Sequence, residues 1–383
     1  MKNILIVTGS RSEYGLLRNI LMEINHSKRL KCFLAVTGTH LSKKYGSTLS
    51  EIKKDKFEIH SKLNLKFSKN ENKNLMENSL LIIKTVSQIL TKKNIDMCIL
   101  LGDRYEAFAS AVACTINDIK IAHIHGGELS EGSKDDIFRH SITKMSNLHF
   151  VATNDYKKRV LQLGEDPRHI FNFGALCNDT IRKIKFLNKK NFLKKNNLKF
   201  NKTLLVCCHP EISKKQNKIL VNNLLKVLEN QKKVNIIFTY PNSDPGSEYI
   251  IEKLKQFTKK NKNSKIYKSL GHESFLQFLK NSECIIGNSS SGIIEAPLLG
   301  IKTINIGERQ KGRLLSKTVF QISSHRNKIK NTLRNILKKQ KKQKYQCAYR
   351  GKNVAKKIIK AIEIIELNQL NTKRFNDIKF KNG

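Results

Sequence analysis

The residues of this chain that are best suited to chemistry gather in short polar segments, and the first is Thr8–Tyr14. Its glycine turn places Arg11 at the start of an expected helix. Backbone N–H groups and a guanidinium there favour an anion, because the helix dipole and the arginine fork both suit phosphate oxygens. An ordinary strand-to-helix turn explains the same residues equally well. Neither GxGxxG nor GxxxxGK followed by Ser or Thr occurs, which disfavours a dinucleotide fingerprint and a P-loop.

Two further segments combine carboxylates with basic side chains. Asp103 and Arg104 follow a short apolar run, and they fit either a helix cap with a surface ion pair or a pair of site residues. His125 and Glu128 lie in a segment with paired glycines, and Asp135 follows shortly afterwards. Carboxylates and imidazoles in one crevice tune each other's pKa values toward neutrality. General acid–base chemistry is the use that these segments predict.

A metal site is the alternative for the two histidines of this region. His123 and His125 alternate along the chain, so in a continuing strand they would face the same side and be able to share a metal. No second cluster supplies the remaining ligands. We therefore expect hydrogen bonding or proton transfer from them, and neither a metal nor another cofactor.

The second half of the chain carries two segments that suit a nucleotide. His209 follows a short apolar run. Residues 287–297 are rich in serine and glycine, and the amides of Ser289 and Ser290 can approach a diphosphate closely. Serine-rich turns also cap helices without binding anything. Glu295, further along the same segment, is poorly placed for phosphate and is suited to accept two hydroxyls of a ribose.

The elements that position these segments follow from hydrophobic periodicity. Short apolar runs alternate with longer segments of helical period, which predicts strand–helix units and parallel sheets covered on both faces. The expected fold class is α/β with two Rossmann-like halves. Polar segments directly after the strands then meet at the carboxyl edge of each sheet. The strands expected are Ile4–Thr8, Cys32–Thr37, Met97–Leu101, Ile119–Ile124, Leu148–Ala152, Thr203–Cys208, Val234–Thr239, Lys265–Tyr267, Cys284–Gly287 and Thr303–Ile306.

A seam near Gly174–Asn178 separates the two halves. The domains expected are residues 1–175, with the carboxylates Asp103, Glu128 and Asp135, and residues 176–365, with the two segments that suit a nucleotide. Residues 366–383 form a polar tail. The lysine- and asparagine-rich stretch Lys185–Lys202 fits a linker or the solvated face of a helix.

Composition bounds the class of protein. The 383 residues include 73 Lys and Arg against 31 Asp and Glu, a net charge of +42, which first suggests a nucleic acid or an acidic membrane as partner. The lysines are spread along nearly the whole chain, which argues against a dedicated nucleic-acid site. Eight cysteines without a CxxC pair predict a reducing, cytoplasmic location, and no apolar run is long enough for a signal peptide or a membrane span.

Seven segments together resemble the hydrolysing UDP-N-acetylglucosamine 2-epimerase family, whose members make N-acetylmannosamine for sialic acid. They occur in the family's order over roughly residues 3–325: TGSRSEYG at 8–15, LGDRYEA at 101–107, HIHGGE at 123–128, DDIFRHSITKMS at 135–146, YPNSDPGS at 240–247, GNSSSGIIEAP at 287–297 and NIGERQKGR at 305–313. The resemblance implies two Rossmann-like domains in a glycosyltransferase-B-type arrangement, with a nucleotide sugar in the interdomain cleft. It also implies a homo-oligomer built from dimers.

The resemblance assigns roles by matching positions. On the nucleotide side it implies that Arg11 contacts the diphosphate, that His209 is the cleft histidine and that Ser289 and Ser290 hold phosphate. It also implies that Glu295 binds the ribose and that Asn242, Arg309 and Arg313 are additional nucleotide-side groups. On the sugar side the residues at or beside catalytic positions are Asp103, Arg104, His40, Glu128 and Asp135. Some relatives have a Glu where this chain has His125. Proton transfer therefore passes to His125 or Glu128, or is shared with Asp135.

The reaction expected follows from the weak acidity of the substrate. The C2 hydrogen of an N-acetylhexosamine has no neighbouring carbonyl in the ring, so departure of the nucleotide must come first and give a glycal. Water then adds back and C2 receives its proton on the opposite face. The first expectation is UDP-N-acetylglucosamine as substrate and N-acetylmannosamine as product. Alternatives are a UDP- or GDP-linked 2,4-diacetamido-2,4,6-trideoxyglucose on a legionaminic acid route, a glycosyltransferase of the same fold, and a nucleic-acid-binding protein.

Overall fold

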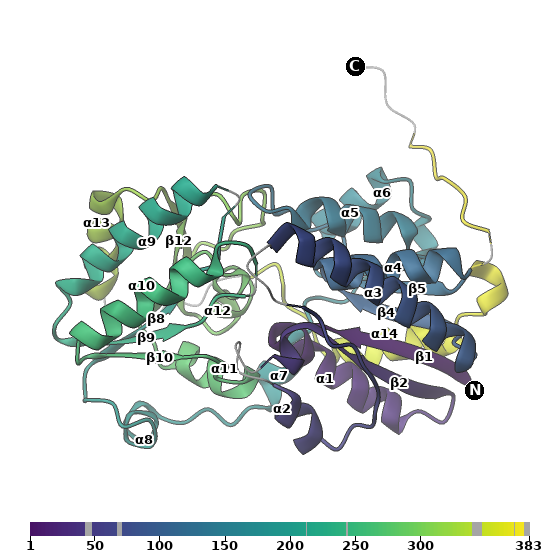
Figure 1. Cartoon of the computed structure of the whole chain (residues 1–383), viewed down its shortest axis with the longest axis horizontal. Helices are drawn as coiled ribbons and strands as arrows, with labels where there is room; N and C mark the ends of the chain where they lie inside the picture. The colour runs from purple at the N-terminus through teal and green to yellow at the C-terminus, as the bar shows by residue number, and fades with distance from the viewer. Residues whose placement is uncertain are drawn as a thin grey trace. The chain divides into compact units, whose positions relative to one another are not determined.

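The computed structural model describes residues 1–42, 48–66, 71–211, 213–242, 244–338, 347–370 and 372–378, and their contacts divide the chain into two units (Figure 1). Unit 1 comprises Met1–Glu128, Asp135–Thr180 and Tyr349–Gly383. Unit 2 comprises Leu129–Lys134 and Ile181–Ala348.

Unit 1 is built on a parallel sheet whose strands lie in the order β3-β2-β1-β4-β5-β6-β7. These strands are β1 (Lys2–Thr8), β2 (Leu30–Val36), β3 (Ile59–Lys62), β4 (Met97–Leu101), β5 (Lys120–Ile124), β6 (Leu148–Val151) and β7 (Ile170–Asn172). The helices of this part of the chain are α1 (Arg11–His26), α2 (Leu49–Lys54), α3 (Glu71–Lys92), α4 (Tyr105–Ile116), α5 (Asp135–Met145), α6 (Asn154–Gln162), α7 (Cys177–Lys183) and α14 (Val354–Ile364).

Unit 2 is built on a second parallel sheet with the order β10-β9-β8-β11-β12-β13. Its strands are β8 (Lys202–Cys207), β9 (Val234–Thr239), β10 (Ser264–Tyr267), β11 (Cys284–Gly287), β12 (Lys302–Ile306) and β13 (Val319–Ile322). Its helices are α8 (Lys189–Lys195), α9 (Lys214–Glu229), α10 (Ser247–Lys260), α11 (His272–Lys280), α12 (Glu295–Leu298) and α13 (Arg326–Lys338). The two sheets confirm the predicted α/β fold class with two Rossmann-like parts.

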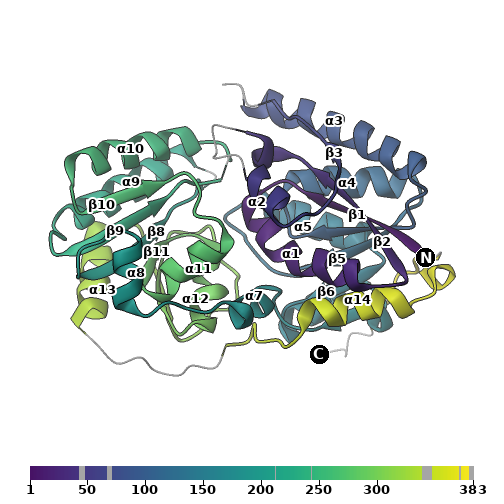
Figure 2. The ribbon, with the colours of Figure 1, turned by 90° about the horizontal axis from the view of Figure 1, so that it is seen from below.

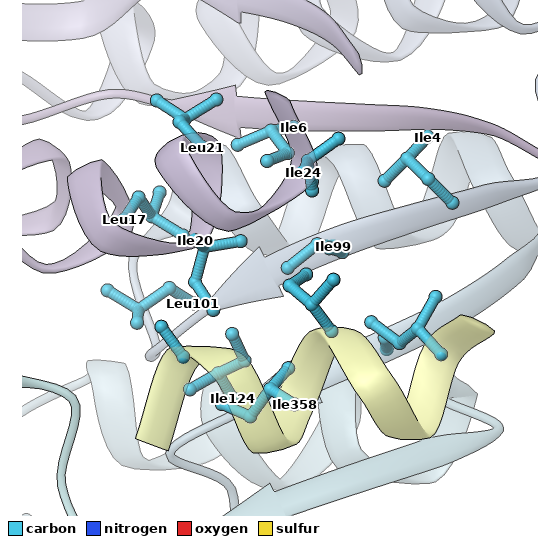
Figure 3. Packing of buried hydrophobic residues seen from close by; sticks show 14 of the residues in the cluster. Ile4, Ile6, Leu17, Ile20, Leu21, Ile24, Ile99, Leu101, Ile124 and Ile358 are labelled. Carbon is cyan, nitrogen blue, oxygen red and sulfur yellow. The ribbon is translucent and has the colours of Figure 1, made fainter. Parts of the chain in front are cut away.

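Both faces of the unit 1 sheet are buried, because its central strands are apolar at successive positions. Ile4 and Ile6 of β1 pack toward α1 and α14, whereas Leu5 and Val7 pack toward α3 and α4. Figure 2 shows these two pairs of helices on opposite sides of the sheet. Figure 3 shows the side chains of α1 and the strands packed against Ile358 of α14. Continuous apolar runs of this kind are the sequence pattern of a strand covered on both faces.

The order of strands reverses at one place in each sheet. In unit 1 the chain moves outward from β1 to β2 and β3, and then returns to place β4 on the other side of β1. In unit 2 the same reversal separates β8 from β11. Open parallel sheets bind ligands outside the carboxyl ends of the strands at such a reversal. The polar segments after β1, β4, β8 and β11 all lie there.

The last helix belongs to a different unit from the one expected. The sequence predicts residues 176–365 as one C-terminal domain, whereas the structure places Tyr349–Gly383, and α14 with it, in unit 1. Val354, Ile358 and Ile362 of α14 are buried in the unit 1 core beside α1. The apolar stripe of α14 predicts a buried helix face, but a stripe alone does not specify which sheet covers it.

Shorter elements also differ from the sequence-based expectation. Strands β3, β7 and β13 were not predicted, since each is short and partly exposed and therefore lacks an apolar run. Within Lys185–Lys202 the chain forms α8, which buries Phe192 and Leu193 and exposes its lysines. In the polar tail, Lys373 forms an ion pair with Glu165 at 2.6 Å.

Two features bear on the class of protein. No helix among the described residues combines the length and the apolar character needed to cross a membrane. All eight cysteines lie in the described part of the chain as free thiols.

Asp179 should stabilise the docked α14. Its carboxylate oxygens accept the N–H groups of Val354 at 3.0 Å and Ala355 at 2.8 Å, which satisfies the first turn of α14. Asp179→Ala leaves both buried N–H groups without this acceptor and should lower the free energy of unfolding by about 1–3 kcal/mol. Asp179→Asn keeps one oxygen acceptor and should cost less. Urea unfolding of the three proteins measures this, and equal stability of wild type and Asp179→Ala would contradict it.

Candidate functional site

A chain of charged side chains runs inside unit 1 next to the carboxyl ends of β4 and β5. Asp103 follows β4, Glu128 follows β5, and Arg139 comes from α5. The Arg139 guanidinium contacts the Asp103 carboxylate with one terminal nitrogen and donates to Glu128 Oε2 at 3.4 Å with the other. The Arg139 and Glu128 side chains are each 2% exposed, and the Asp103 side chain is 21% exposed. Asp103 is the member of this chain that solvent reaches most easily.

His125 extends this chain by one more contact. Its Nδ1 lies 2.6 Å from Glu128 Oε1, and the backbone N–H of Leu176 donates to its Nε2 at 3.4 Å. Because Nε2 accepts a hydrogen bond, the network assigns the proton of the neutral ring to Nδ1, facing Glu128. The structure therefore brings Asp103, Glu128 and His125 close together, with Arg139 between the two carboxylates. Their part in acid–base chemistry stays a prediction.

The backbone turns sharply at His125. Its φ of +66° lies in the left-handed region, which a bulky side chain rarely adopts. Gly127 follows with φ +74°, where an added Cβ would lie 2.5 Å from the Tyr156 carbonyl oxygen. The turn ends the alternation of β5, so His123 and His125 contact different partners and do not form the shared face considered from the sequence. The positive φ costs conformational free energy, and this backbone conformation positions the His125 ring against Glu128.

His123 is a fixed, neutral residue in this arrangement. It is fully buried, donates from Nε2 to the Gly102 carbonyl at 2.7 Å and accepts from Thr143 Oγ1 at Nδ1, 3.1 Å away. Burial lowers the pKa of His123 to about 3. Its hydrogen bond to Gly102 holds the backbone directly before Asp103.

Arg104 lies in a second buried cluster. Its Nε is 3.1 Å from Glu106 Oε2 and 3.9 Å from Glu13 Oε1, and all three side chains are buried. Burial, and then the neighbouring Glu106 carboxylate, raise the pKa of Glu13 to about 7, against the opposing effect of Arg104. Arg104, expected on the sugar side, is thus engaged in neutralising carboxylates of its own chain.

The start of α1 differs from the anion site considered from the sequence. Glu13 Oε2 accepts the N–H groups of Gly9 at 2.7 Å and Ser10 at 3.1 Å, and Ser10 Oγ accepts the N–H of Glu13. This is a capping box, in which the chain's own side chains satisfy the first amides of the helix. The Gly9 and Ser10 amides therefore bind Glu13 rather than a phosphate. Arg11 is half-buried at the first position of α1.

The remaining sugar-side candidates are His40 and Asp135. His40 is fully buried, with Nε2 3.0 Å from Thr8 Oγ1 and Nδ1 2.5 Å from Thr48 Oγ1. Burial lowers the pKa of His40 to about 3, and the charge of Arg11 acts in the same direction. A neutral ring with both nitrogens engaged is suited to holding the chain rather than to moving a proton. Asp135 is the half-buried first residue of α5.

In unit 2, Asn288 joins the two strand ends at the reversal. Its side chain accepts the His209 N–H at 2.7 Å and donates to the His209 carbonyl at 2.9 Å. Asn242 donates its N–H to His209 Nδ1 at 3.2 Å. Nδ1 is thus an acceptor, so the neutral ring of His209 carries its proton on Nε2. His209 is thereby held as a hydrogen-bond donor at the carboxyl end of β8.

The backbone of Asn288 continues the network toward the loop after β12. Its carbonyl oxygen accepts hydrogen bonds from the Arg309 guanidinium at 3.3 Å and from the Gln310 side-chain amide at 3.0 Å. Directly before it, Gly287 has φ +136°, and an added Cβ would lie 2.0 Å from the Cys207 carbonyl oxygen, so only glycine fits. Hydrogen bonds thus connect three nucleotide-side candidates around Asn288, namely His209, Asn242 and Arg309. Ser289 and Ser290 follow Asn288 directly in the sequence.

Glu295 is the first residue of α12, and a short 3-10 helix, η4 (Ser290–Gly292), precedes it. Glu295 Oε1 lies 3.0 Å from Nε2 of His272, the first residue of α11. Arg313 follows in the loop after β12 and is half-buried.

Several residues of these clusters were missed by reasoning from the sequence. Arg139 and His272 lie on helices, where one buried polar side chain leaves no periodic signal. Glu13 had a readable signal, because Ser10 and Glu13 form the Ser-x-x-Glu pattern of a capping box. Among the described residues, no group of three or more His, Cys, Asp or Glu side chains has a metal-binding arrangement.

Comparisons with known proteins bear on the use of these clusters. The sequence model of the family described as "UDP-N-acetylglucosamine 2-epimerase" matches residues 22–363. A Campylobacter jejuni protein named "GDP/UDP-N,N'-diacetylbacillosamine 2-epimerase (hydrolyzing)" is 39% identical over 322 residues, which are 83% of this chain and 84% of the relative. The Escherichia coli "Polysialic acid biosynthesis protein P7" is 37% identical over 331 residues, 86% of this chain and 84% of the relative.

A solved structure shows the same fold. The "S. aureus MnaA-UDP co-structure" superposes with a TM-score of 0.79 at 18% identity, covering 98% of this chain and all of that one. At this identity the likeness concerns the fold alone. It confirms the α/β class derived from the two parallel sheets.

Glu13 should make stability depend on pH. The pKa of Glu13 is about 7 in the folded protein and lower when it is unfolded, so the folded state binds more protons between these values. Stability from this group is present at low pH and is lost as pH rises through about 7. Glu13→Gln keeps an oxygen for Gly9 and Ser10 but no titrating group. In thermal melts, the Tm of the variant relative to that of wild type should be higher at pH 8 than at pH 5. A Tm difference that does not change with pH would contradict the assignment.

Arg139 should be essential for keeping the buried Glu128 carboxylate close to the partly exposed Asp103 carboxylate. Arg139→Met leaves Asp103 and Glu128 without their shared cation, and should lower the free energy of unfolding at pH 7 by about 3–5 kcal/mol. The loss should shrink at pH 5, because isolated buried carboxylates take up protons. Arg168→Met, in an exposed ion pair with Asp166, is the matched control and should change stability very little. Equal urea stability of the two variants at pH 7 would refute this role.

Proposed function

Because the chain belongs to the UDP-N-acetylglucosamine 2-epimerase family, we propose that it is a hydrolysing 2-epimerase that releases UDP from a UDP-linked amino sugar and inverts the sugar at C2. The coarse activity, epimerisation of a UDP-sugar at C2, follows from the family. Hydrolysis is supported by the Campylobacter jejuni relative, which is named as hydrolysing.

For the sugar, we propose 2,4-diacetamido-2,4,6-trideoxyglucose carried on UDP, with GDP as the other carrier to test. The relative at 39% identity is named for N,N'-diacetylbacillosamine, which favours the substrate that the sequence suggested second. UDP-N-acetylglucosamine, the substrate expected first, is kept as the second candidate because the family description names it. The name of the Escherichia coli relative, a polysialic acid biosynthesis protein, also fits the second candidate.

The proposed reaction balances as a hydrolysis. The C1–oxygen bond to the diphosphate breaks, and the nucleotide leaves with both bonding electrons. The positive character at C1 makes the C2 proton removable, and a carboxylate takes it, giving a C1=C2 glycal. Water then adds its oxygen to C1 while C2 receives a proton on the opposite face. The products are UDP and the free C2 epimer, formed from one substrate and one water.

The two units offer groups for the two halves of this reaction. In unit 2, His209 presents an N–H donor and Arg309 a guanidinium, which suit the negative charge that develops on a leaving diphosphate. In unit 1, Asp103, Glu128 and Asp135 are carboxylates suited to moving the C2 proton. The contact chain from Asp103 through Arg139 to Glu128 is the single observation that supports the proton-transfer role most directly, since it holds two carboxylates beside β4 and β5. We further propose a cytoplasmic homo-oligomer, as the cysteine pattern and the resemblance predict.

A substrate panel tests the proposal. Wild-type protein is incubated without any acceptor sugar with UDP- and GDP-linked 2,4-diacetamido-2,4,6-trideoxyglucose and with UDP-N-acetylglucosamine, and the products are read by mass spectrometry and NMR. We expect free nucleotide and the C2-inverted sugar, formed fastest from the UDP-linked diacetamido sugar. Asp103→Asn should lower kcat by about 10²-fold or more, the scale of a lost acid–base group, and leave the Kd of UDP nearly unchanged.

Other outcomes separate the rival functions. Nucleotide release that requires an added acceptor would instead support a glycosyltransferase. Oligonucleotide binding that weakens steeply with salt, with no turnover of any donor, would support a nucleic-acid-binding protein. Full activity in folded Asp103→Asn would remove Asp103 from the mechanism.

A further inference from the structure

The segment between two proposed proton-transfer residues belongs to the other unit. Glu128 and Asp135 are assigned to unit 1, whereas Leu129–Lys134 between them is assigned to unit 2 by its contacts. The chain therefore leaves unit 1 directly after Glu128 and returns to it at Asp135. We call Leu129–Lys134 the connecting segment.

The connecting segment packs on the loop after β12, residues 307–313. The Glu131 N–H donates to the Lys311 carbonyl at 3.2 Å, and the Lys311 ammonium lies 3.4 Å from Glu131 Oε2. Gly132 lies so close to the loop that an added Cβ would be 2.3 Å from the Glu308 carbonyl oxygen. Its φ is not in the left-handed region, so this close approach, rather than backbone conformation, is what requires glycine at position 132.

The same loop is held from its other side by the nucleotide-side cluster. The Asn288 carbonyl oxygen accepts hydrogen bonds from the side chains of Arg309 and Gln310. Glu211 Oε1 accepts the Glu308 N–H at 3.1 Å. An added Cβ at Gly307 would lie 2.0 Å from Glu211 Oε1, so the loop also fits closely against this carboxylate. Residues 307–313 thus contact both the cluster proposed to bind the diphosphate and the connecting segment.

We propose that the connecting segment is a positioning element, which couples binding of the nucleotide at the Arg309 loop to the placement of Glu128 and Asp135. The inference rests on the proposed function, since it needs a diphosphate at Arg309. A ligand that orders the loop also orders the segment bound to it, and both ends of that segment are covalently joined to proton-transfer residues. A displacement of about 1 Å at a reacting group can cost about 10²-fold in rate. Gly132 is the positioning residue, because a larger side chain there separates the segment from the loop.

Hydrogen exchange of the wild-type protein with and without UDP tests the coupling. We expect UDP to slow exchange in peptides covering 305–313 and also in those covering 129–134, where the Glu131 amide is bound to the loop. Slowing at 305–313 with no change at 129–134 would overturn the proposal while leaving the proposed function standing. No slowing in either peptide, with no turnover of the donor panel, would contradict the proposed function itself.

Gly132→Ala tests the consequence for catalysis. We expect kcat to fall by about 10²-fold, the Kd of UDP to stay within about threefold, and the UDP effect on 129–134 to disappear while that on 305–313 persists. Gly300→Ala is the matched control, because its added Cβ meets nothing within 4 Å although its φ is +72°. Gly300→Ala should be less stable than wild type, but it should not show a large fall in kcat at a nearly constant Kd of UDP. Normal kcat in folded Gly132→Ala would overturn the proposal, and if that variant does not fold, the wild-type exchange result decides.

Discussion

Both units depend on one constraint of parallel sheets, which is that all strands point their carboxyl ends to the same edge. The reversal of strand order between β1 and β4, and again between β8 and β11, leaves the loops after these strands adjacent with no crossing connection between them. Asp103 and Arg11 follow one such pair of strands, and His209 and Asn288 follow the other. The contacts of Arg104 with Glu13 and of Asn288 with His209 join segments across these reversals, which the topology brings together although they are far apart in sequence.

The polar clusters of the two units differ in their chemistry. In unit 1, Arg104 contacts the carboxylates of Glu13 and Glu106, and Arg139 contacts those of Asp103 and Glu128. In unit 2, Asn288 organises the strand ends through neutral hydrogen bonds, and its carbonyl oxygen accepts a hydrogen bond from the Arg309 guanidinium. Carboxylates suit a ring that becomes cationic and a proton that must move, whereas N–H donors and a guanidinium suit a departing anion.

The sequence predicted the repeated elements well, because buried strands have long apolar runs and amphipathic helices have a clear period. It did not predict the placement of α14, since an apolar stripe does not say which sheet covers it. Asp103, Glu128 and His125 were identified as candidates from residue type and position after strands. The interaction that joins them was not, because Arg139 is a single buried polar residue on α5. At the start of α1, where the sequence left an anion site and an ordinary turn equally open, the Gly9 and Ser10 amides bind Glu13.

The central claim is that loss of the nucleotide and inversion at C2 proceed through removal and return of the C2 proton. The most direct measurement is to run the reaction of the UDP-linked amino sugar in D₂O and to examine the free product by NMR. The account predicts one deuterium at C2 of the inverted sugar, acquired from solvent, together with free UDP. An inverted product that keeps its original hydrogen at C2, or UDP released with C2 unchanged, would contradict it.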